Sequence, residues 1–304
     1  MTVSGTVQTD RDTDGGAPEI AVVIPHFDDV ERLTRCLGAL TAQDLAGAEI
    51  IVADNATPGG LDAVEAAFGG VRFVTEPERG AAAARNAGVA ASTAGWIAFL
   101  DSDCVPAPDW AARLREIVAG PRDSVTGGRV DVFDETPPPR TGAEVFETVF
   151  AFDQKTYVEK KGFSVTANLV TARATFAAVG PFRPGVSEDL DWCRRATAAG
   201  YGLRYDPALV VRHPTRSGWP ALRRKWLRLT AEGFGLLRDG YPPRVVWALK
   251  ALAMPLSVAA HIPRILRHPG LSATDRARGI ATLTRLRLHR MGWMLRQASG
   301  RDPR

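Results

Sequence analysis

The sequence predicts an α/β fold built around a mainly parallel, doubly wound sheet. Four short apolar runs, at residues 20–25, 50–53, 71–74 and 96–100, have the length and the bulky side chains of buried strands. Segments with a helical spacing of apolar residues separate these runs, and crossover helices of this kind join parallel strands. Neither GxGxxG after the first run nor GxxxxGK[ST] occurs in the chain, which argues against a dinucleotide site and a P-loop.

The first third of the chain alternates strand and helix. After the strand at 20–25, the apolar face of an amphipathic helix is formed by Val30, Leu33, Leu37 and Leu40. The second strand ends at Asp54 and is followed by a helix over 61–68. The third strand precedes Arg79-Gly80, which opens an alanine-rich helix, and the fourth strand ends at Asp101.

The middle of the chain is less regular. We expect strands over 125–133 and 162–170, with a helix within 142–158 between them. Ser187 is suited to cap a helix whose first turn contains acidic residues. Residues 203–206 and 208–213 then predict a pair of strands that ends in a histidine.

Two carboxylates follow the most apolar strand. Trp96 to Leu100 is a fully apolar run, and Asp101 and Asp103 come directly after it. Open α/β sheets bind their ligands at the carboxyl ends of the strands, where these acids would emerge. They are suited to hold a divalent cation. The alternative is a turn in which an aspartate caps the next helix.

The charge of the chain is unevenly distributed. Residues 1–200 contain 18 Lys and Arg against 29 Asp and Glu, a net charge of −11. Residues 201–304 contain 20 against 5, a net charge of +15. We therefore divide the chain into a leader over 1–18, an α/β domain over 19–215 and a basic, mostly helical region over 216–304.

The leader and the cysteines indicate where the protein acts. Residues 1–18 are polar and lack an apolar run, so we expect a disordered leader rather than a signal peptide. Cys36, Cys104 and Cys193 lie far apart and form no CxxC pair. This predicts a reduced, cytoplasmic protein without a disulfide framework or a zinc knuckle.

Several segments together resemble the family 2 glycosyltransferases, which have the Rossmann-like GT-A fold and use nucleotide-activated sugars. They follow the family's order over about residues 20–213, and they are Val23 to Asp28, Ile51 to Thr57, Arg79 to Gly88, Ile97 to Asp103, and Gly180 to Phe182 with Glu188 to Asp191. The resemblance implies that 19–215 is a GT-A catalytic domain that binds a nucleotide sugar. The basic region would then be a helical C-terminal extension.

The resemblance implies which residues bind the nucleotide. Pro25 and Phe27 would line the pocket for the base, and Phe27 would stack on the ring. Asp54 would accept a hydrogen bond from the base, and Arg79 would lie near the nucleotide.

The resemblance also implies a metal site. Asp103 would bind the Mn²⁺ or Mg²⁺ that bridges the diphosphate, and Asp101 would contact the ribose or the water shell of the metal. His213 would be a further metal ligand, as in some relatives, although an isolated histidine is more often structural.

The acidic segment after Ser187 would supply the base. By the resemblance, Asp189 would take the proton of the acceptor hydroxyl in a single displacement that inverts the configuration at C1. Glu188, Asp191 and Asn168 would contact the substrates, with Asp191 as a second candidate for the base. The simpler interpretation is that acids in this first turn only complement the helix dipole.

The basic region has two interpretations. Apolar stripes interleaved with basic residues recur at helical spacing, and they are Trp219, Leu222, Trp226 and Leu229, and Thr284, Leu288, Met291 and Leu295. One interpretation is a peripheral contact with the anionic inner face of the cell membrane, which would present the site to a lipid-linked or other saccharide acceptor. The other is that these helices pack on the catalytic domain or on a second subunit.

A rival hypothesis makes the chain a non-catalytic nucleic-acid-binding protein that uses the basic helices. No helix-turn-helix, zinc or RNA-binding aromatic signature accompanies those helices, so we expect no specific nucleic-acid partner. A nucleotidyltransferase would need a glycine-rich loop with a basic residue after the first strand, and this chain has none there.

Overall fold

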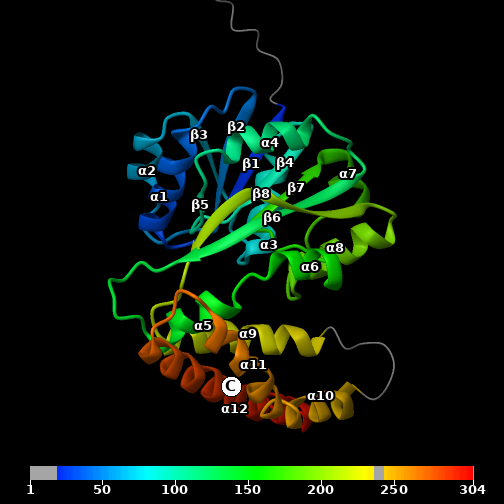
Figure 1. The fold of residues 1–304 in the computed structure, drawn as a ribbon. Helices are drawn as coiled ribbons and strands as arrows, with labels where there is room; N and C mark the ends of the chain where they lie inside the picture. The colour runs from blue at the N-terminus through cyan, green and yellow to red at the C-terminus, as the bar shows by residue number, and fades with distance from the viewer. Residues whose placement is uncertain (1–18, 236–242, 304) are drawn as a thin grey trace, which may run out of the picture.

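The computed structural model describes residues 19–235 and 243–303, and the predicted leader over 1–18 lies outside these ranges. Its eight-stranded sheet has the order β3-β2-β1-β4-β7-β6-β8-β5 (Figure 1). The strands are β1 (Ile20–His26), β2 (Ala48–Asp54), β3 (Val71–Thr75), β4 (Trp96–Leu100), β5 (Val105–Pro106), β6 (Ser124–Phe133), β7 (Asn168–Ala172) and β8 (Gly202–Pro214). Strands β3, β2, β1 and β4 run parallel, whereas β7 is antiparallel to both of its neighbours, β4 and β6.

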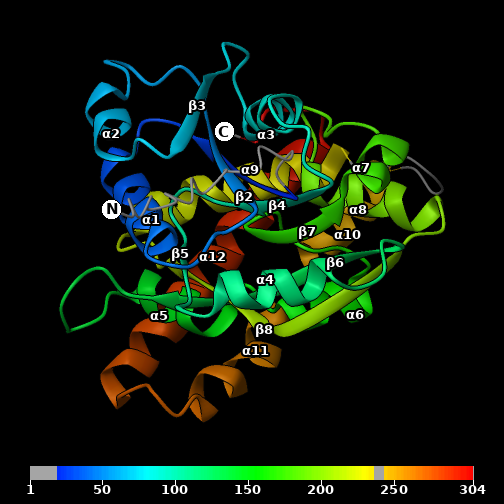
Figure 2. The same ribbon diagram turned by 90° about the horizontal axis from the view of Figure 1, so that it is seen from above.

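Helices cover both faces of this sheet, as the doubly wound prediction requires. The first eight helices of the chain are α1 (Val30–Thr41), α2 (Asp62–Ala67), α3 (Ala81–Ala90), α4 (Trp110–Val118), α5 (Gly142–Phe150), α6 (Gln154–Lys161), α7 (Arg173–Val179) and α8 (Glu188–Ala198). Of these, α5 packs mainly with the C-terminal helices. Side chains alternate along β1, so Val22 and Ile24 pack with α1 and α4 while Val23 packs with α3 and α8. Figure 2 shows α4 and α3 on opposite sides of the sheet.

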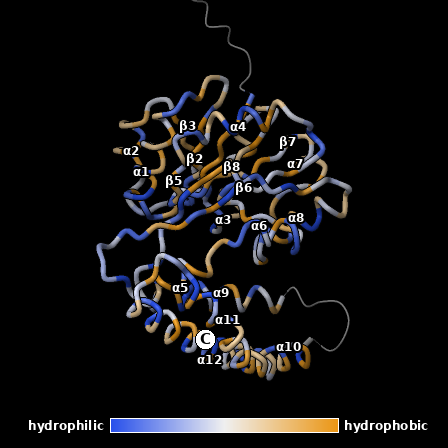
Figure 3. The backbone as a smooth tube through the Cα atoms, in the orientation of Figure 1, coloured by the Kyte–Doolittle hydropathy of each residue, from blue (hydrophilic) through white to orange (hydrophobic). Residues whose placement is uncertain are grey.

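The basic C-terminal region forms a further layer of helices below the sheet in Figure 1. It contains α9 (Trp219–Gly235), α10 (Pro243–Leu252), α11 (Leu256–Arg267) and α12 (Ala273–Ala298). Leu222 of α9 and Leu283 of α12 share a core with Phe146 of α5, which belongs to the α/β part of the sequence. Figure 3 shows hydrophobic residues concentrated along the central strands and a mixed pattern along these helices.

This layer decides part of the question left open by the two predicted stripes. Trp219, Leu222 and Trp226 pack in the core with α5, and Met291 and Leu295 pack around Trp247 and Met294. Packing within the chain therefore accounts for most of both stripes, although Leu288 stays 49% exposed.

The predicted elements are present in the predicted order, with three corrections. The helix expected within 142–158 is two helices, α5 and α6, which residues 151–153 separate. Residues 203–206 and 208–213 form one strand, β8, because β6 continues along it across a single register shift after Gly128. Strand β7 begins at Asn168, and residues 163–167, which we expected to be strand, are not part of it.

Within the described ranges, no single helix is long and apolar enough to cross a membrane. Two consecutive helical segments, Arg244–Leu252 and Leu256–Arg267, together reach that length and composition, and they meet at an angle of 52°.

Close packing of α3 on the sheet predicts the effect of a single methyl group. A Cβ atom at Gly88 would lie 2.4 Å from Cγ1 of the buried Val23, so Gly88→Ala should destabilise the fold by about 1–3 kcal/mol. A Cβ at Gly38 of α1 would meet nothing within 4 Å, so Gly38→Ala should stabilise the protein by about 0.5–1 kcal/mol. Urea unfolding of both variants measures this, and equal stabilities would contradict the packing described.

Candidate active site

A cavity of about 340 Å³ opens at the carboxyl ends of the central strands. Its lining comes from segments far apart in the sequence, which are the ends of β1, β2, β4 and β8, the first turns of α3 and α8, residues 165–167 before β7, and Arg216 and Arg228 from the basic region. Strand β1 lies between β2 and β4, so the strand order reverses beside it. This is the edge at which open α/β sheets bind ligands.

Arg85 of α3 joins two walls of this cavity. Its guanidinium donates to Asp101 Oδ1 at 2.6 Å and to Glu188 Oε1 at 2.9 Å. Arg85 is only 4% exposed, and a buried guanidinium requires such partners. We did not assign a role to Arg85 from the sequence, although an arginine within an alanine-rich buried helix should have indicated an acidic partner.

Asp103 lies beside His213, as the predicted metal site requires. Asp103 Oδ2 is 3.1 Å from His213 Nε2, and His213 Nδ1 donates to the carbonyl of Pro214 at 2.7 Å. Burial raises the pKa of Asp103, but the neighbouring His213 and Arg216 outweigh this and lower it below its usual value. The contact is an ion pair when His213 is protonated. When His213 is neutral, the hydrogen bond from Nδ1 to the Pro214 carbonyl leaves Nε2 able to bind a cation beside Asp103.

The pair therefore fits a divalent cation, with a limited number of protein ligands. Among the residues placed by the structure, no group of three or more His, Cys, Asp or Glu side chains could hold a metal ion. Asp101, the other predicted ligand, pairs with Arg85 instead. A cation held by Asp103 and His213 would need further ligands from water or a substrate, which is common for Mg²⁺.

Glu188 and Asp189 lie in the first turn of α8 and line the same cavity. Asp189 Oδ1 accepts hydrogen bonds from Ser187 Oγ at 2.8 Å and from the backbone N–H of Leu190 at 2.7 Å, and neither bond uses Oδ2. Burial and the adjacent Glu188 raise the pKa of Asp189 above its usual value, which makes its carboxylate a stronger base.

Phe27 and Arg79 lie together near the cavity. Pro25 and Phe27 both line it, and Phe27 is 46% exposed, so its ring has a free area for stacking. The Arg79 guanidinium carbon lies 5.6 Å from the centre of that ring, within the range of a cation–π contact. Arg79 itself is not part of the lining.

Asp54 lies outside the lining and makes hydrogen bonds within the protein. Its carboxylate accepts from His26 Nδ1 at 3.0 Å, from Thr57 Oγ1 at 2.6 Å and from Thr57 N at 2.9 Å. His26 Nε2 in turn accepts from the Asp29 N–H at 3.1 Å. Asp54 therefore fixes the loop after β1, and its hydrogen bond to the base stays a prediction.

Asn168 and Asp191, both predicted to contact the substrates, are not part of the lining, and those contacts stay predictions. Asn168 is fully buried, accepts from Trp110 Nε1 and donates to the carbonyls of Arg129 and Leu209. Asp191 pairs with Arg195 at 2.8 Å. Glu188, in contrast, does line the cavity.

Arg216 and Arg228 were missed because we treated the basic region separately from the site. Arg216 is held by the buried Glu147 of α5, which accepts from its guanidinium at 3.0 Å and its N–H at 2.8 Å. Glu147 also pairs with Lys225 of α9 at 2.8 Å. This buried carboxylate thus joins α5, α9 and the end of β8.

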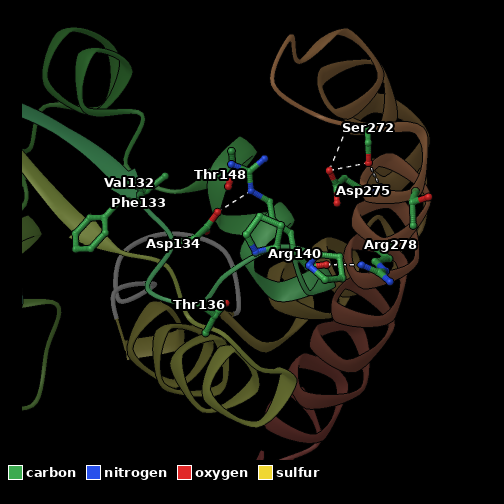
Figure 4. Close-up of a pocket in the computed structure, with 12 residues that line it drawn as sticks. Val132, Phe133, Asp134, Thr136, Arg140, Thr148, Ser272, Asp275 and Arg278 are labelled. Carbon is green, nitrogen blue, oxygen red and sulfur yellow. Dashed lines mark hydrogen bonds and ion pairs between the residues drawn. The ribbon is translucent and has the colours of Figure 1, made fainter.

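A larger cavity of about 860 Å³ lies elsewhere, between the loop after β6 and the start of α12 (Figure 4). Its charged groups already have protein partners. Arg140 donates to Asp134 at 2.6 Å, Arg278 donates to the carbonyl of Arg140, and Ser272 and Asp275 form a capping box. Because these groups hold the loop against α12, we place the chemistry in the smaller cavity.

Comparisons with known proteins identify the family of the chain. The family model described as glycosyl transferase family 2 matches residues 21–183, more than half of the chain. The chain belongs to glycosyl transferase family 2. It is therefore a glycosyltransferase, and the rival hypothesis of a non-catalytic protein is wrong.

Named relatives are also glycosyltransferases. The chain is similar to glycosyltransferase AglE of Haloferax volcanii, with 29% identity over 69% of this chain and 71% of the relative. It is also similar to the pre-mycofactocin glycosyltransferase of Mycobacterium tuberculosis, with 29% identity over 66% of this chain and 43% of that longer protein.

The fold resembles that of a solved family structure along almost its whole length. That structure is mannosyltransferase PcManGT from Pyrobaculum calidifontis in complex with GDP-Man and Mn²⁺, with a TM-score of 0.60 and 18% identity. The match covers 94% of this chain and 87% of the other. The GT-A fold is thus confirmed.

The double ion pair of Arg85 predicts a stability difference. Arg85→Ala would leave Asp101 and Glu188 without their cation in a partly enclosed site, so it should destabilise the protein by about 2–3 kcal/mol. Arg79→Ala, a change at an exposed arginine of the preceding loop, should stay within about 0.5 kcal/mol of the wild type. Equal urea midpoints for the two variants would show that the bridge does not stabilise the fold.

Proposed function

We propose that this glycosyltransferase moves a sugar from a nucleoside-diphosphate donor to an acceptor hydroxyl, with inversion at C1. The observation that carries the proposal is the presence of two different acidic sites in the lining of one small cavity, Asp103 with His213 and Glu188 with Asp189. The first suits a cation that accompanies a diphosphate, and the second suits proton transfer. The similarity to a structure solved with GDP-Man and Mn²⁺ supports a donor of this class.

The donor would lie along the edge formed by β1 and β4. The exposed ring of Phe27 would stack on the base, with Arg79 above it, and Asp101 would face the ribose. Asp103 and His213 would hold Mn²⁺ or Mg²⁺, which when bound offsets the negative charge that develops on the leaving diphosphate. Arg216 is near enough to Asp103 to lower its pKa, so its charge would act on the same phosphates.

Asp189 would act as the base. In a single displacement the acceptor oxygen attacks C1 from the face opposite the leaving diphosphate, and its proton passes to a carboxylate oxygen. Oδ1 is fixed by Ser187 and Leu190, so Oδ2 is the atom that would receive the proton. Because its pKa is raised, the loss of activity at low pH should set in above the usual range of an aspartate.

The two acidic sites predict different defects. Asp103→Ala should abolish the Mn²⁺-dependent part of nucleotide binding, since it removes one of the two ligands. Asp189→Asn should keep nucleotide binding and lower kcat by about 10²–10⁴-fold, because an amide cannot take the proton. Calorimetry with UDP, GDP and dTDP, followed by a donor screen, measures both. Full transfer activity in Asp189→Asn would assign the base to another group.

The acceptor would be reached from a membrane surface, in keeping with a cytoplasmic protein that is peripheral on the inner face of the cell membrane. Val245, Leu249, Leu252 and Leu256, which recur at helical spacing on α10 and α11, are each 56–77% exposed. Residues 243–272 contain Arg244, Lys250, Arg264 and Arg267 and no Asp or Glu. Leucines flanked by basic residues favour an anionic bilayer as the occupant of this surface, and a lipid-linked saccharide would then be the acceptor.

Replacing two of these leucines tests the membrane surface. Leu249→Ser with Leu252→Ser should reduce co-sedimentation with vesicles that contain an anionic phospholipid, and high salt should release the wild type. Val30→Ser, at another exposed apolar residue on α1, is the matched control and should bind like the wild type. Unchanged sedimentation of the double variant would exclude this surface as the membrane contact. If the wild type is a dimer and the double variant is a monomer, the occupant of this surface is a second copy of the chain.

A further inference from the structure

Helix α9 brings one arginine of the basic region to the active-site cavity. Arg228 lines the cavity together with Glu188 and Asp189, which come from a different part of the chain. Its partner Glu232, one turn further along α9, lies 3.8 Å from the Arg228 guanidinium. In Figures 1 and 2 the second half of α9 lies on the side of α8, the helix that carries Glu188 and Asp189. Burial, and after it Glu188 and Asp189, raise the pKa of Glu232, which agrees with this placement.

Arg228 differs from the other cations of the cavity in how it is paired. Arg85 makes two short ion pairs, at 2.6 and 2.9 Å, and Arg216 is bound by the buried Glu147 at 3.0 Å. Arg228 has Glu232 at 3.8 Å, and its side chain is 63% exposed. An exposed i,i+4 pair at that distance contributes little, so the guanidinium keeps its capacity to bind an anion.

The position of Arg228 also separates it from the donor phosphates. Arg216 follows His213 closely at the end of β8, whereas Arg228 lies in the second half of α9, on the side of the helix α8 that carries Glu188 and Asp189. The donor diphosphate belongs with Asp103 and His213, and the acceptor hydroxyl belongs with Asp189. An anion bound by Arg228 would thus be part of the acceptor.

We propose, on the basis of the function above, that Arg228 selects acceptors that carry a phosphate close to the hydroxyl that reacts. The guanidinium would bind the phosphate through two N–H donors and hold the hydroxyl against Asp189. The positive charge of Arg228 would attract the acceptor phosphate, which Glu188 and Asp189 would otherwise repel. A saccharide joined to a lipid through phosphate has this chemistry, and so has a soluble sugar phosphate.

Glucose 1-phosphate and glucose are a pair of probes that differ only in the phosphate. Binding is measured by calorimetry with Mn²⁺ present, once with and once without a saturating nucleoside diphosphate. The wild type should bind glucose 1-phosphate at least about tenfold more tightly than glucose. Arg228→Ala should remove this difference, and Arg228→Lys should restore part of it. Arg224→Ala removes an exposed arginine one turn earlier on α9, outside the lining, and should keep the difference.

Several results would overturn the proposal. Equal binding of the two probes by the wild type, or a phosphate preference that survives in Arg228→Ala, would show that Arg228 does not read a phosphate. A loss of UDP, GDP or dTDP binding in Arg228→Ala would place Arg228 at the donor instead. If the wild type bound none of these nucleotides, the proposed function would fail. The measurements of the two glucose probes without nucleotide would still decide the role of Arg228.

The source of the phosphate is decided with the same variants. Farnesyl phosphate presented in detergent micelles, with farnesol as its neutral partner, replaces the sugar pair. A phosphate preference that depends on Arg228 for the farnesyl pair supports a lipid-linked acceptor, and one confined to the glucose pair supports a soluble sugar phosphate.

Discussion

The active site depends on one buried cation. Arg85 lies in the helix after β3. One of its partners, Asp101, lies at the end of β4, and the other, Glu188, lies at the start of α8, 103 residues further along the chain than Arg85. Two carboxylates close together repel each other, and a guanidinium that forms an ion pair with both offsets this repulsion and holds them in place. Arg85 therefore holds the end of β4 and the start of α8 together at the cavity.

A second buried charge connects the C-terminal helices to this arrangement. Glu147 is 2% exposed and would be costly there without partners. Arg216 and Lys225 both bind it. Burial raises the pKa of Glu147, but the two cations outweigh this effect and lower the pKa below its usual value. Lys225 and Arg228 belong to the same helix, so the ion pair between Lys225 and Glu147 also helps to hold Arg228 at the cavity. The basic region thus contributes to the lining of the cavity.

Much of the fold could be predicted because it follows from local patterns. Apolar runs and helical spacing identify the strands and crossover helices, and strand direction then brings Asp101, Asp103 and His213 to one edge. Side-chain partners could not be predicted in this way. Asp54 and Asn168 are polar residues next to the site in sequence, but Thr57, His26 and Trp110 use their hydrogen-bonding capacity, and only the packed structure shows that. The resemblance identified positions that face the edge of the sheet, without showing which of them face solvent.

The uneven charge of the chain has a physical explanation in the cavity. The α/β part contributes four carboxylates to the lining, Asp101, Asp103, Glu188 and Asp189, and a single arginine, Arg85. That surface alone would repel a nucleoside diphosphate. In the proposed function, a divalent cation at Asp103 and His213, together with Arg216, would offset this repulsion for the donor, and Arg228 would offset it for an anionic acceptor. The acidic first two-thirds of the sequence and the basic last third therefore both contribute charged side chains to one cavity.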